Sequence, residues 1–504
     1  MNSSFICAAC RRSARSINGS ASFKRSYIRP SFAPKPVLDL KHIRQNPGLY
    51  EQNCIDRNYN EQARNGWRIL ELHESLVEKQ KQVIQARQRS NAIGKEVGKQ
   101  AAAGAGKKET LLEEAKKLKE LLSAFEDAEK GIQDEMEKLA LELPNLSSQH
   151  TPVGKEPQVV EVINEDLDIS RSMLSKSHVD IGKELDIIDF EASATTSGWG
   201  WYFLKNEGAL LEQALIQYAL SVAMKRGWKV MTPPSLVYSH IANACGFMPR
   251  DQNGETQIYG IAQSEHDRTS DKPGLVLAGT AEIPFAGSQA SKTLKAEDLP
   301  LKVIGPSRSY RAEAGARGVD TKGLYRVHEF TKVEMFAWTM PPPDSEGDRF
   351  GNDDDDKLPQ TEDVFTEMLD IQKEILTSLN LHAKVLEMPS SDLGASATRK
   401  IDMEAFFPSR QSIDDGYGEV TSASICTDYQ SRRLSTRLKL PGGAAKLGWP
   451  HTVNGTAMAI PRILACILEN HWKEDQGAVQ VPECLRAYMP GNVAYIERRV
   501  VAAA

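Results

Sequence analysis

The chain has 504 residues, 40% of them hydrophobic, and a formal net charge of −6. This length allows two or more domains with sizeable cores, and the weakly acidic balance argues against a protein that binds nucleic acid through its overall charge. No apolar run is long enough to cross a bilayer, so we expect no membrane association. The seven cysteines are scattered, and we interpret them as reduced and mostly structural, with neither a disulfide framework nor a zinc site.

Residues 1–36 contain seven basic residues and no Asp or Glu, and the first acidic residue is Asp39. Serines and alanines are interspersed, and this composition is typical of a mitochondrial presequence. A disordered basic tail is the alternative, but disorder does not require such a complete lack of acidic residues. We therefore predict a presequence over residues 1–36 and a location in the mitochondrial matrix.

Residues 37–145 predict a helical hairpin. Two long segments carry apolar residues at alternating three- and four-residue steps, which is the pattern of a coiled-coil seam. The first seam includes Ile69, Leu72, Leu76, Val83, Ala86, Ile93 and Val97, and the second includes Leu111, Ala115, Leu118, Leu122, Phe125, Ile132, Met136 and Leu139. One short Gly- and Ala-rich break at 98–108 separates them. The two helices should therefore run antiparallel, and each should project about 45 Å.

The two arms of this hairpin differ in charge. Between Lys79 and Lys108 the bases greatly outnumber the single acid Glu96, whereas the returning helix is rich in Glu and Asp. Pairing between the arms explains part of this pattern, and coiled coils contact proteins more often than RNA. The excess of cations towards the tip nevertheless suits a surface that follows a phosphate backbone, and the candidates are Lys95, Lys99, Lys107 and Lys108.

We interpret residues 146–165 as a linker, and residues 166–504 have the composition of a mixed α/β domain. Segment 341–360 is acidic and contains several Pro and Gly residues, so we interpret it as a disordered surface loop rather than a metal site. The elements expected before this loop are a helix over 208–228, a short strand over 229–237 interrupted by Pro233 and Pro234, and a strand leading to a turn with Thr280 and Glu282.

Segment 307–338 predicts a strand, a glycine-bearing loop and a second strand. In an extended backbone Arg311 and Glu313 project from one face, and the period of two also places Phe330 and Glu334 together. A fixed cation, carboxylates and an aromatic ring suit an anionic ligand that contains a base. The alternative, that these charges are ordinary solvated pairs on a sheet surface, is about equally compatible with this segment alone.

Two later stretches carry further candidates. A strand-like run at 417–434 contains Glu419 and Ser422. The stretch 451–472 begins as a strand, should turn at its Asn-Gly pair, and continues as an apolar helix with Arg462 near its start. Backbone N–H groups at a helix N-terminus already favour anions, so a guanidinium there predicts an anion site.

Three separated stretches together resemble the motifs of class II aminoacyl-tRNA synthetases. RGWKVMTPPSLV resembles the first class motif, SYRAEAG with GLYRVHEFTKVEMF the second, and NGTAMAIPRILACILEN the third. Within the class, the details resemble the seryl-tRNA synthetases: GTAE, VHEFTKVE, EVTSASICTDYQSRR, and a hairpin opened by LDLKHIRQNP and closed by LPN. The resemblance covers nearly the whole chain from Val37 onwards.

This resemblance implies an α+β fold class. The N-terminal antiparallel helical hairpin, a coiled coil, would be followed by a catalytic domain built on an antiparallel sheet flanked by helices. It also implies a homodimer with the Pro233 region at its interface.

The resemblance implies roles for individual residues. Arg311 would hold the α-phosphate of ATP and Arg462 the γ-phosphate, and with Glu419 they would form the catalytic set. Phe330 would stack on adenine, and Glu313 would accept a hydrogen bond from the adenine amino group. The implied ATP site consists of Arg311, Ala312, Glu313, Val327, His328, Phe330, Glu419, Val420, Thr421, Ser422 and Arg462.

The L-serine pocket implied by the resemblance consists of Thr280, Ala281, Glu282, Arg311, Glu334 and Thr456. In it, Glu334 would pair with the substrate ammonium and Thr456 with the substrate hydroxyl. Such a pocket rejects alanine by leaving polar groups unpaired. Glu419 and Ser422 would hold Mg²⁺ through hard oxygen ligands.

The implied reaction is the ATP-dependent ligation of L-serine to tRNA(Ser) through a seryl-adenylate, for mitochondrial translation. It needs no protein nucleophile, because positioning and neutralisation of phosphate charge can supply the acceleration. The helical hairpin would contact the tRNA across the dimer.

One position departs from the family pattern. Ala423-Ser424-Ile425 stands where the family usually has Cys-Ser-Asn, so a polar contact made by the Asn is in doubt. This departure is the only support for an alternative hypothesis, a catalytically silent synthetase-like paralogue that binds RNA. Retention of both phosphate-binding arginines argues against that alternative. A class II ligase for another amino acid is the third hypothesis.

Overall fold

The computed structural model describes residues 33–99, 105–167, 176–247, 257–269, 272–313, 323–342, 359–440 and 447–498. Most of the expected presequence and most of the expected acidic loop at 341–360 lie outside these ranges. None of the described helices is long and apolar enough to cross a membrane.

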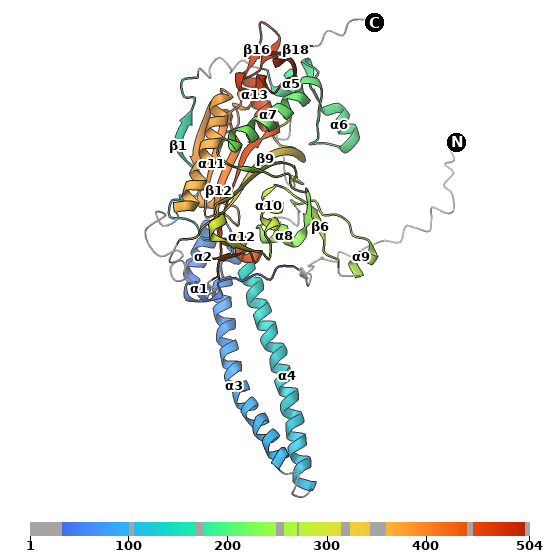
Figure 1. Cartoon of the computed structure of the whole chain (residues 1–504), viewed down its shortest axis with the longest axis vertical. Helices are drawn as coiled ribbons and strands as arrows, with labels where there is room; N and C mark the ends of the chain where they lie inside the picture. Colours follow the sequence, from blue (N-terminus) through green and yellow to red (C-terminus); the bar gives the residue numbers. More distant parts are fainter. Residues whose placement is uncertain are drawn as a thin grey trace, which may run out of the picture.

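A long helical arm projects from the body of the molecule (Figure 1). Helices α3 (Asn65–Lys99) and α4 (Ala105–Leu141) form its antiparallel shaft, and α1 (Leu40–Gln45) and α2 (Pro47–Asp56) pack at its base. The predicted seam is buried along α3 at Ile69, Leu72, Leu76, Val83 and Ile93. At the base this seam joins a small core that includes Tyr50, Cys54, Met136, Ala140 and Leu143. The helical hairpin expected from the sequence is confirmed.

The rest of the chain is built on an eight-stranded sheet in the order β1-β10-β11-β12-β15-β9-β8-β4. Neighbouring strands are antiparallel except for β4 and β8, which are parallel. The strands are β1 (Gln158–Ile163), β4 (Lys229–Val230), β8 (Leu301–Tyr310), β9 (Glu329–Thr339), β10 (Ala383–Glu387), β11 (Arg399–Phe406), β12 (Tyr417–Thr427) and β15 (His451–Ala459). The expected α+β class, with an antiparallel sheet flanked by helices, is confirmed.

Helices cover one face of this sheet and bury the main core. They are α7 (Asn206–Met224), α11 (Pro359–Ser378) and α13 (Ile460–Asn470) (Figure 1). A second, smaller core forms where α8 (Ser239–Ala244) and α10 (Glu282–Ser288) approach β8 and β9. The other helices are α5 (His178–Glu184), α6 (Phe190–Ser197), α9 (Glu265–Thr269), α12 (Tyr429–Arg433) and α14 (Glu483–Arg486).

Short strands form small sheets around the large one. They are β2 (Ile188–Asp189), β3 (Phe203–Leu204), β5 (Leu236–Tyr238), β6 (Leu275–Leu277), β7 (Thr293–Lys295), β13 (Arg437–Lys439), β14 (Leu447–Gly448), β16 (Trp472–Lys473), β17 (Ala478–Gln480) and β18 (Tyr495–Glu497). Pro233 and Pro234 therefore separate two strands, β4 and β5, that belong to different sheets, because proline cannot donate to a sheet ladder.

The turn expected at Asn454-Gly455 is wrong. Strand β15 continues through both residues, and Gly455 pairs with Met335 on one side and Ala423 on the other. A Cβ on Gly455 would lie 3.2 Å from the Cβ of Ala423. The glycine therefore allows close packing in the centre of the sheet, which an isolated Asn-Gly pair cannot reveal.

The expected linker at 146–165 contains regular structure. Strand β1 lies within it and pairs with β10 at the edge of the large sheet. Val159 and Val160 are both more than half exposed, so the strand lacks the alternation of a half-buried strand. Because β1 has no alternation of apolar and polar residues, the periodicity of the sequence does not indicate this strand.

Candidate active site

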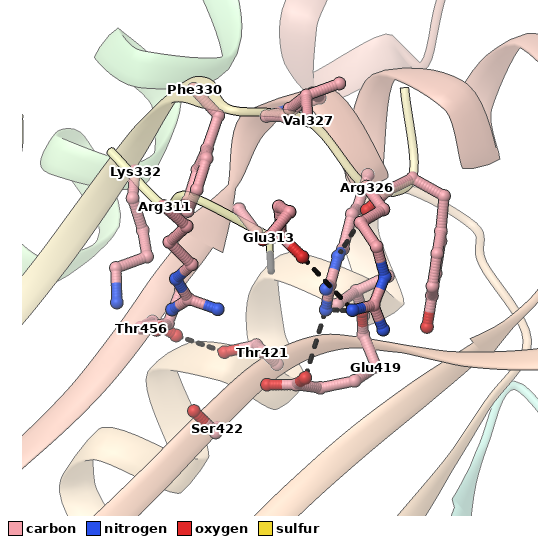
Figure 2. Close-up of a pocket in the computed structure, with 15 residues that line it drawn as sticks. Arg311, Glu313, Arg326, Val327, Phe330, Lys332, Glu419, Thr421, Ser422 and Thr456 are labelled. Atoms are coloured by element: carbon pink, nitrogen blue, oxygen red, sulfur yellow. Dashed lines mark hydrogen bonds and ion pairs between the residues drawn. The ribbon is translucent and has the colours of Figure 1, made fainter. Parts of the chain in front are cut away.

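A pocket that opens to solvent lies on the face of the sheet opposite the main core. Ten residues expected from the sequence line it: Arg311, Glu313, Val327, Phe330, Glu419, Val420, Thr421, Ser422, Thr456 and Arg462. Figure 2 shows the side chains of Arg311, Lys332 and Glu419 pointing into the same space. Segments more than 150 residues apart in the chain thus meet in one site.

The alternation of β9 explains which of its residues reach this pocket. Val333 and Met335 face the main core, whereas Phe330 and Lys332 line the pocket on the other face. Beyond the end of β8, the backbone N–H of Arg311 donates to the carbonyl of His328 at 2.9 Å. The Arg311 guanidinium lies 5.3 Å from the centre of the Phe330 ring.

The sequence argument that placed Arg311 and Glu313 on one face was wrong in its premise. Strand β8 ends at Tyr310, and Glu313 has a φ of 48°, which is left-handed and not extended. Both side chains nevertheless line the pocket, because the backbone turns there. Glu313 accepts a hydrogen bond from Nη1 of Arg326 at 3.1 Å.

Arg462 enters the pocket from the start of α13, one residue after Pro461 in the first helical turn. Its Nε donates to the carbonyl of Tyr325 at 3.0 Å, and its Nη1 donates to the carbonyl and to Oε2 of Glu419 at 2.8 and 3.0 Å. The guanidinium also lies 4.6 Å from the centre of the Tyr325 ring. These contacts fix the orientation of the planar Arg462 guanidinium before any ligand binds.

An irregularity in β12 brings Glu419 and Ser422 to the same side. A spacing of three would place them on opposite faces of a regular strand. The pairing with β11, however, passes from Met403–Thr421 to Glu404–Glu419, so Val420 is an extra residue of a bulge. Both side chains are partly exposed and line the pocket, while Val420 packs in the main core.

The charges of the pocket are strongly coupled. Burial alone would raise the pKa of Glu419, but Arg462, Lys400 and Arg311 more than offset it and hold the pKa at about 2. Dense surroundings and the like charge of Arg462 lower the pKa of Arg311. Two cations that repel each other and share one carboxylate form a site with a surplus of positive charge, which suits a polyphosphate.

Behind the pocket wall lies a buried polar group centred on Glu334. Nζ of Lys332 lies 2.6 Å from Oε2 of Glu334, and the hydroxyl of Thr456 lies 3.4 Å from the same oxygen. Burial and the neighbouring charge of Glu334 raise the pKa of Glu282 to about 8, although Lys332 acts in the opposite direction. Thr280 and Ala281 are buried beside Glu282 at the start of α10.

Six expected residues do not line the pocket in this structure. Four of them, Thr280, Ala281, Glu282 and Glu334, belong to the buried group just described. The other two contact the pocket loop: Ala312 donates from its backbone N–H to the carbonyl of Gln257, and Nδ1 of His328 lies 3.0 Å from the carbonyl of Arg311. His328 is also surrounded by Trp199, Trp201 and Tyr259.

Ile425 lies away from the pocket. Its side chain is 2% exposed and belongs to the main apolar core, opposite Val453 of β15. An isoleucine in this place packs well, and it removes no side chain from the pocket lining.

Sequence reasoning missed five lining residues: Tyr325, Arg326, Lys332, Ala459 and Pro461. The alternative of solvated pairs on the sheet surface does not hold for Lys332, because this residue is buried and lines the pocket. Tyr325 and Arg326 stand within the second motif stretch, GLYRVHEFTKVEMF, but their place in the pocket depends on a loop conformation that the motif does not reveal.

Among the lysines expected to contact RNA, Lys95 is exposed on α3 near the tip of the arm. The side chains of Lys99, Lys107 and Lys108 lie outside the described residues. Within the part of the chain that the structure describes, no group of three His, Cys, Asp or Glu residues is placed to hold a metal ion.

Comparison with known proteins agrees with this architecture. Residues 267–471 match the tRNA synthetase class II core domain (G, H, P, S and T), and residues 37–147 match the seryl-tRNA synthetase N-terminal domain. The sheet, the pocket and these matches define the protein as a class II aminoacyl-tRNA synthetase.

Comparison with individual relatives identifies the family within this class of synthetases. The mitochondrial serine–tRNA ligase of Saccharomyces cerevisiae is 37% identical over 92% of this chain and 97% of its own length, and that of Schizosaccharomyces pombe is 38% identical over 92% and 90%. The seryl-tRNA synthetase of Pyrococcus horikoshii, solved in complex with ATP, has a TM-score of 0.78 and 29% identity over 92% of this chain and all of its own. The chain therefore belongs to the serine–tRNA ligase family.

Proposed function

We propose that this chain joins L-serine to tRNA(Ser) with ATP through a seryl-adenylate, and that it does so in the mitochondrial matrix. One observation carries the catalytic part of the proposal. Arg311 and Arg462, from distant segments, converge on a pocket that also holds an aromatic ring and a carboxylate with a pKa of about 2. That combination fits a nucleoside triphosphate whose phosphates need neutralisation.

ATP would lie with its adenine against Phe330 and near Glu313. Arg311 would bind the α-phosphate, and Arg462, already held by Glu419 and Tyr325, would bind the γ-phosphate. The ATP complex of the Pyrococcus horikoshii relative supports this assignment of the ligand. Backbone and side-chain groups of Ala312, Val327, His328, Val420 and Thr421 would complete the site.

Serine would enter the deep end of the pocket. Glu334 would pair with its ammonium and Thr456 with its hydroxyl, while Thr280, Ala281 and Glu282 would close the far wall. Binding of an ammonium there would displace Lys332 from Glu334, so Lys332 would act as the internal partner that satisfies the carboxylate in the free protein.

In the first step, a serine carboxylate oxygen attacks the α-phosphorus, the bond to the leaving pyrophosphate breaks, and seryl-adenylate forms. In the second, a hydroxyl of the terminal adenosine of the tRNA attacks the seryl carbonyl carbon, and AMP leaves. Arg311 is placed to stabilise the charge that develops on the α-phosphate. No protein nucleophile is required, because the reacting groups are aligned by binding.

The residues present fit a magnesium ion at this site. The bulge in β12 turns Glu419 and Ser422 towards the pocket, and hard oxygen ligands in this number suit Mg²⁺ when phosphates supply the rest. Bound Mg²⁺ would neutralise phosphate charge. The role of this chain would be to hold the ion by Glu419 and Ser422.

We assign residues 37–145 to a tRNA-binding arm and residues 166–504 to catalysis. Lys95 and the neighbouring lysines of the tip would contact phosphates. A homodimer through the Pro233 region is supported by exposed apolar side chains that are close to it in the sequence: Val230, Met231, Leu236 and Tyr238.

Two observations support the mitochondrial location. Residues 1–36 have the composition of a presequence, and both fungal relatives are named mitochondrial enzymes. The carbonyl of Lys35 accepts a hydrogen bond from Ser435 of the catalytic part. Because Lys35 lies within the predicted presequence, this contact favours cleavage on the N-terminal side of Lys35 instead of after residue 36.

Serine-dependent exchange of labelled pyrophosphate into ATP tests the proposal. The purified protein should catalyse exchange with serine and not with threonine, proline or alanine. Arg311→Ala should abolish exchange without lowering the unfolding temperature appreciably, because the guanidinium is exposed to the pocket.

The outcomes also decide between the hypotheses. Folded protein that gives no exchange would favour the silent RNA-binding paralogue, for which Ile425 no longer offers support because it lies in the core. Exchange with another amino acid would favour a different ligase. Activity retained by Arg311→Ala would overturn the phosphate assignment.

A further inference from the structure

We propose that Asn145 is a positioning residue for tRNA, which fixes the angle at which the helical arm leaves the catalytic sheet, and that Arg433 supports it at the end of α4. This inference rests on the proposed function of the arm. It concerns residues outside the pocket that take no part in amino-acid activation.

Asn145 is the point at which the arm is attached to the sheet. Its side-chain Nδ2 donates to the carbonyls of Ser396 and Cys426 at 2.9 Å each and lies 3.1 Å from the hydroxyl of Thr427. Its backbone N–H donates to the carbonyl of Ala395 at 2.8 Å. One residue therefore binds two separate segments of the catalytic part.

Residues at the base of the arm also form hydrogen bonds with Asn145. The carbonyl of Asn145 accepts from Nδ2 of Asn53 at 3.1 Å and from Nη1 of Arg57, both at the end of α2. Arg57 is fully buried, and its Nη2 donates to the carbonyl of Gly394 in the catalytic part. Four segments thus meet at Asn145, and every contact is a directional hydrogen bond.

Arg433 fixes the end of the long helix. It lies on α12, and its Nη2 donates to the carbonyls of Leu141 and Leu143 at 3.5 and 3.2 Å. The last carbonyls of a helix lack intrahelical partners, and a cation there is favoured by the helix dipole. The guanidinium is 7% exposed and lies 3.4 Å from the centre of the Tyr429 ring.

A surface groove lies beside Asn145, between the arm base and α12, and is lined by residues such as Leu38, Tyr50, Leu143 and Arg432. The apolar core at the arm base is non-directional, whereas the hydrogen bonds of Asn145 and Arg433 define one orientation of the arm.

The length of the arm makes a small tilt important. Helix α4 has 37 residues, which at about 1.5 Å per residue is roughly 55 Å. A tilt of about 5° at the base would move the tip by about 5 Å. Strand β12 carries Glu419 and Ser422 in the pocket and Cys426 and Thr427 at the attachment point, so the arm is aligned directly to the reaction site.

Asn145→Ala tests this assignment in the full-length protein. We expect pyrophosphate exchange to stay within about twofold of the wild type, and kcat/KM for tRNA in aminoacylation to fall at least about tenfold. A single-turnover measurement of seryl transfer from preformed adenylate should locate the loss in the tRNA step.

A matched control comes from Asn164, which also donates to three backbone carbonyls, those of Leu376, Thr377 and Leu381, but lies far from the arm. Because its φ is 53°, glycine is the suitable replacement. Asn164→Gly should lower the unfolding temperature as Asn145→Ala does, with no selective effect on the tRNA step.

Arm orientation can also be measured directly. Spin labels on Ile84→Cys and Val159→Cys, both exposed positions, report the distance between arm and sheet. The background carries Cys7→Ser, Cys10→Ser and Cys484→Ser, which remove the two cysteines of the expected presequence and the one described cysteine that is not buried. Asn145→Ala should broaden the distance distribution. If Asn145→Ala does not fold, Arg433→Lys is the second variant. It keeps the positive charge but loses the planar guanidinium, so it should broaden the distance distribution and lower kcat/KM for tRNA by a smaller amount.

Other results would overturn the proposal. An unchanged tRNA step would show that Asn145 does not position the arm, and a parallel loss of exchange and aminoacylation would reduce its role to general stability. A wild-type protein that neither exchanges pyrophosphate nor charges tRNA would instead contradict the proposed function, so the two failures are distinguishable.

Discussion

The arm and the catalytic sheet use the same charged residue types in different ways. In the arm, Arg89 and Glu114 pair across the two helices while 45% and 41% of their side chains remain exposed. In the sheet, Lys332 and Glu334 pair with only 9% and 3% exposed. Exposed pairs contribute little, whereas a buried charge that loses its partner is costly. The buried charges of the pocket therefore carry a cost in stability that a function such as the proposed one would explain, whereas the exposed charges of the arm cost little.

After Arg311→Ala, for which we expect complete loss of exchange, the next largest effect is that of Glu419→Gln. The substitution removes the carboxylate whose charge interacts with Arg462, Lys400 and Arg311, so the two arginines that we propose to bind phosphates lose a neighbouring negative charge. Pyrophosphate exchange should fall by about 10²-fold or more, as expected when preorganised charge is disturbed.

A matched control breaks another Arg–Glu pair of the same sheet. Glu387 accepts from Nε and Nη2 of Arg399 at 3.1 and 2.9 Å, away from the pocket. Glu387→Gln should lower the unfolding temperature but leave exchange by the folded protein intact. If Glu419→Gln and Glu387→Gln had equal exchange activity, the charges of the pocket would be no more important for exchange than other buried charges of the sheet.

Glu282→Gln should change the pH dependence of stability. The carboxyl has a pKa of about 8 in the folded chain against an ordinary value of 4.5. Between these values the folded chain holds a proton that the unfolded chain has released, so stability falls as pH rises. Glutamine resembles the protonated acid and should stabilise the free protein by more than about 1 kcal/mol at pH 8.5, with no difference below pH 4.5.

Urea unfolding at several pH values measures this difference. Glu334 and Lys332 face Glu282, so both must be kept in the variant. A constant difference between the two proteins at all pH values would mean that Glu282 is not protonated in the folded state.

The smallest expected effect is in the arm. Arg89→Ala removes a bidentate pair with Glu114, at 2.7 and 2.8 Å, that is nearly half exposed. It should lower the free energy of unfolding by less than about 0.5 kcal/mol, and salt should abolish the difference. A loss above about 1 kcal/mol would show that the arm depends on its ion pairs and not on its apolar seam.

Much of this architecture could be predicted from the sequence. The seams of α3 and α4 depend on residues three and four apart, and such local periodicity survives without tertiary information. The pocket residues Arg311, Phe330 and Arg462 could be named because they stand in motifs whose order is recognisable. The edge strand β1 could not, because neither of its faces is consistently buried.

Local patterns and motifs in the sequence are enough to predict the helical arm, the class of sheet and most of the residues that line the pocket. Three features became apparent only in the folded structure: the bulge at Val420 that brings Glu419 and Ser422 together, the packing of Gly455 within the sheet, and the attachment of the arm by Asn145. These features depend on contacts between segments far apart in the chain. No local pattern encodes such contacts, because each is a property of two surfaces that meet only after folding.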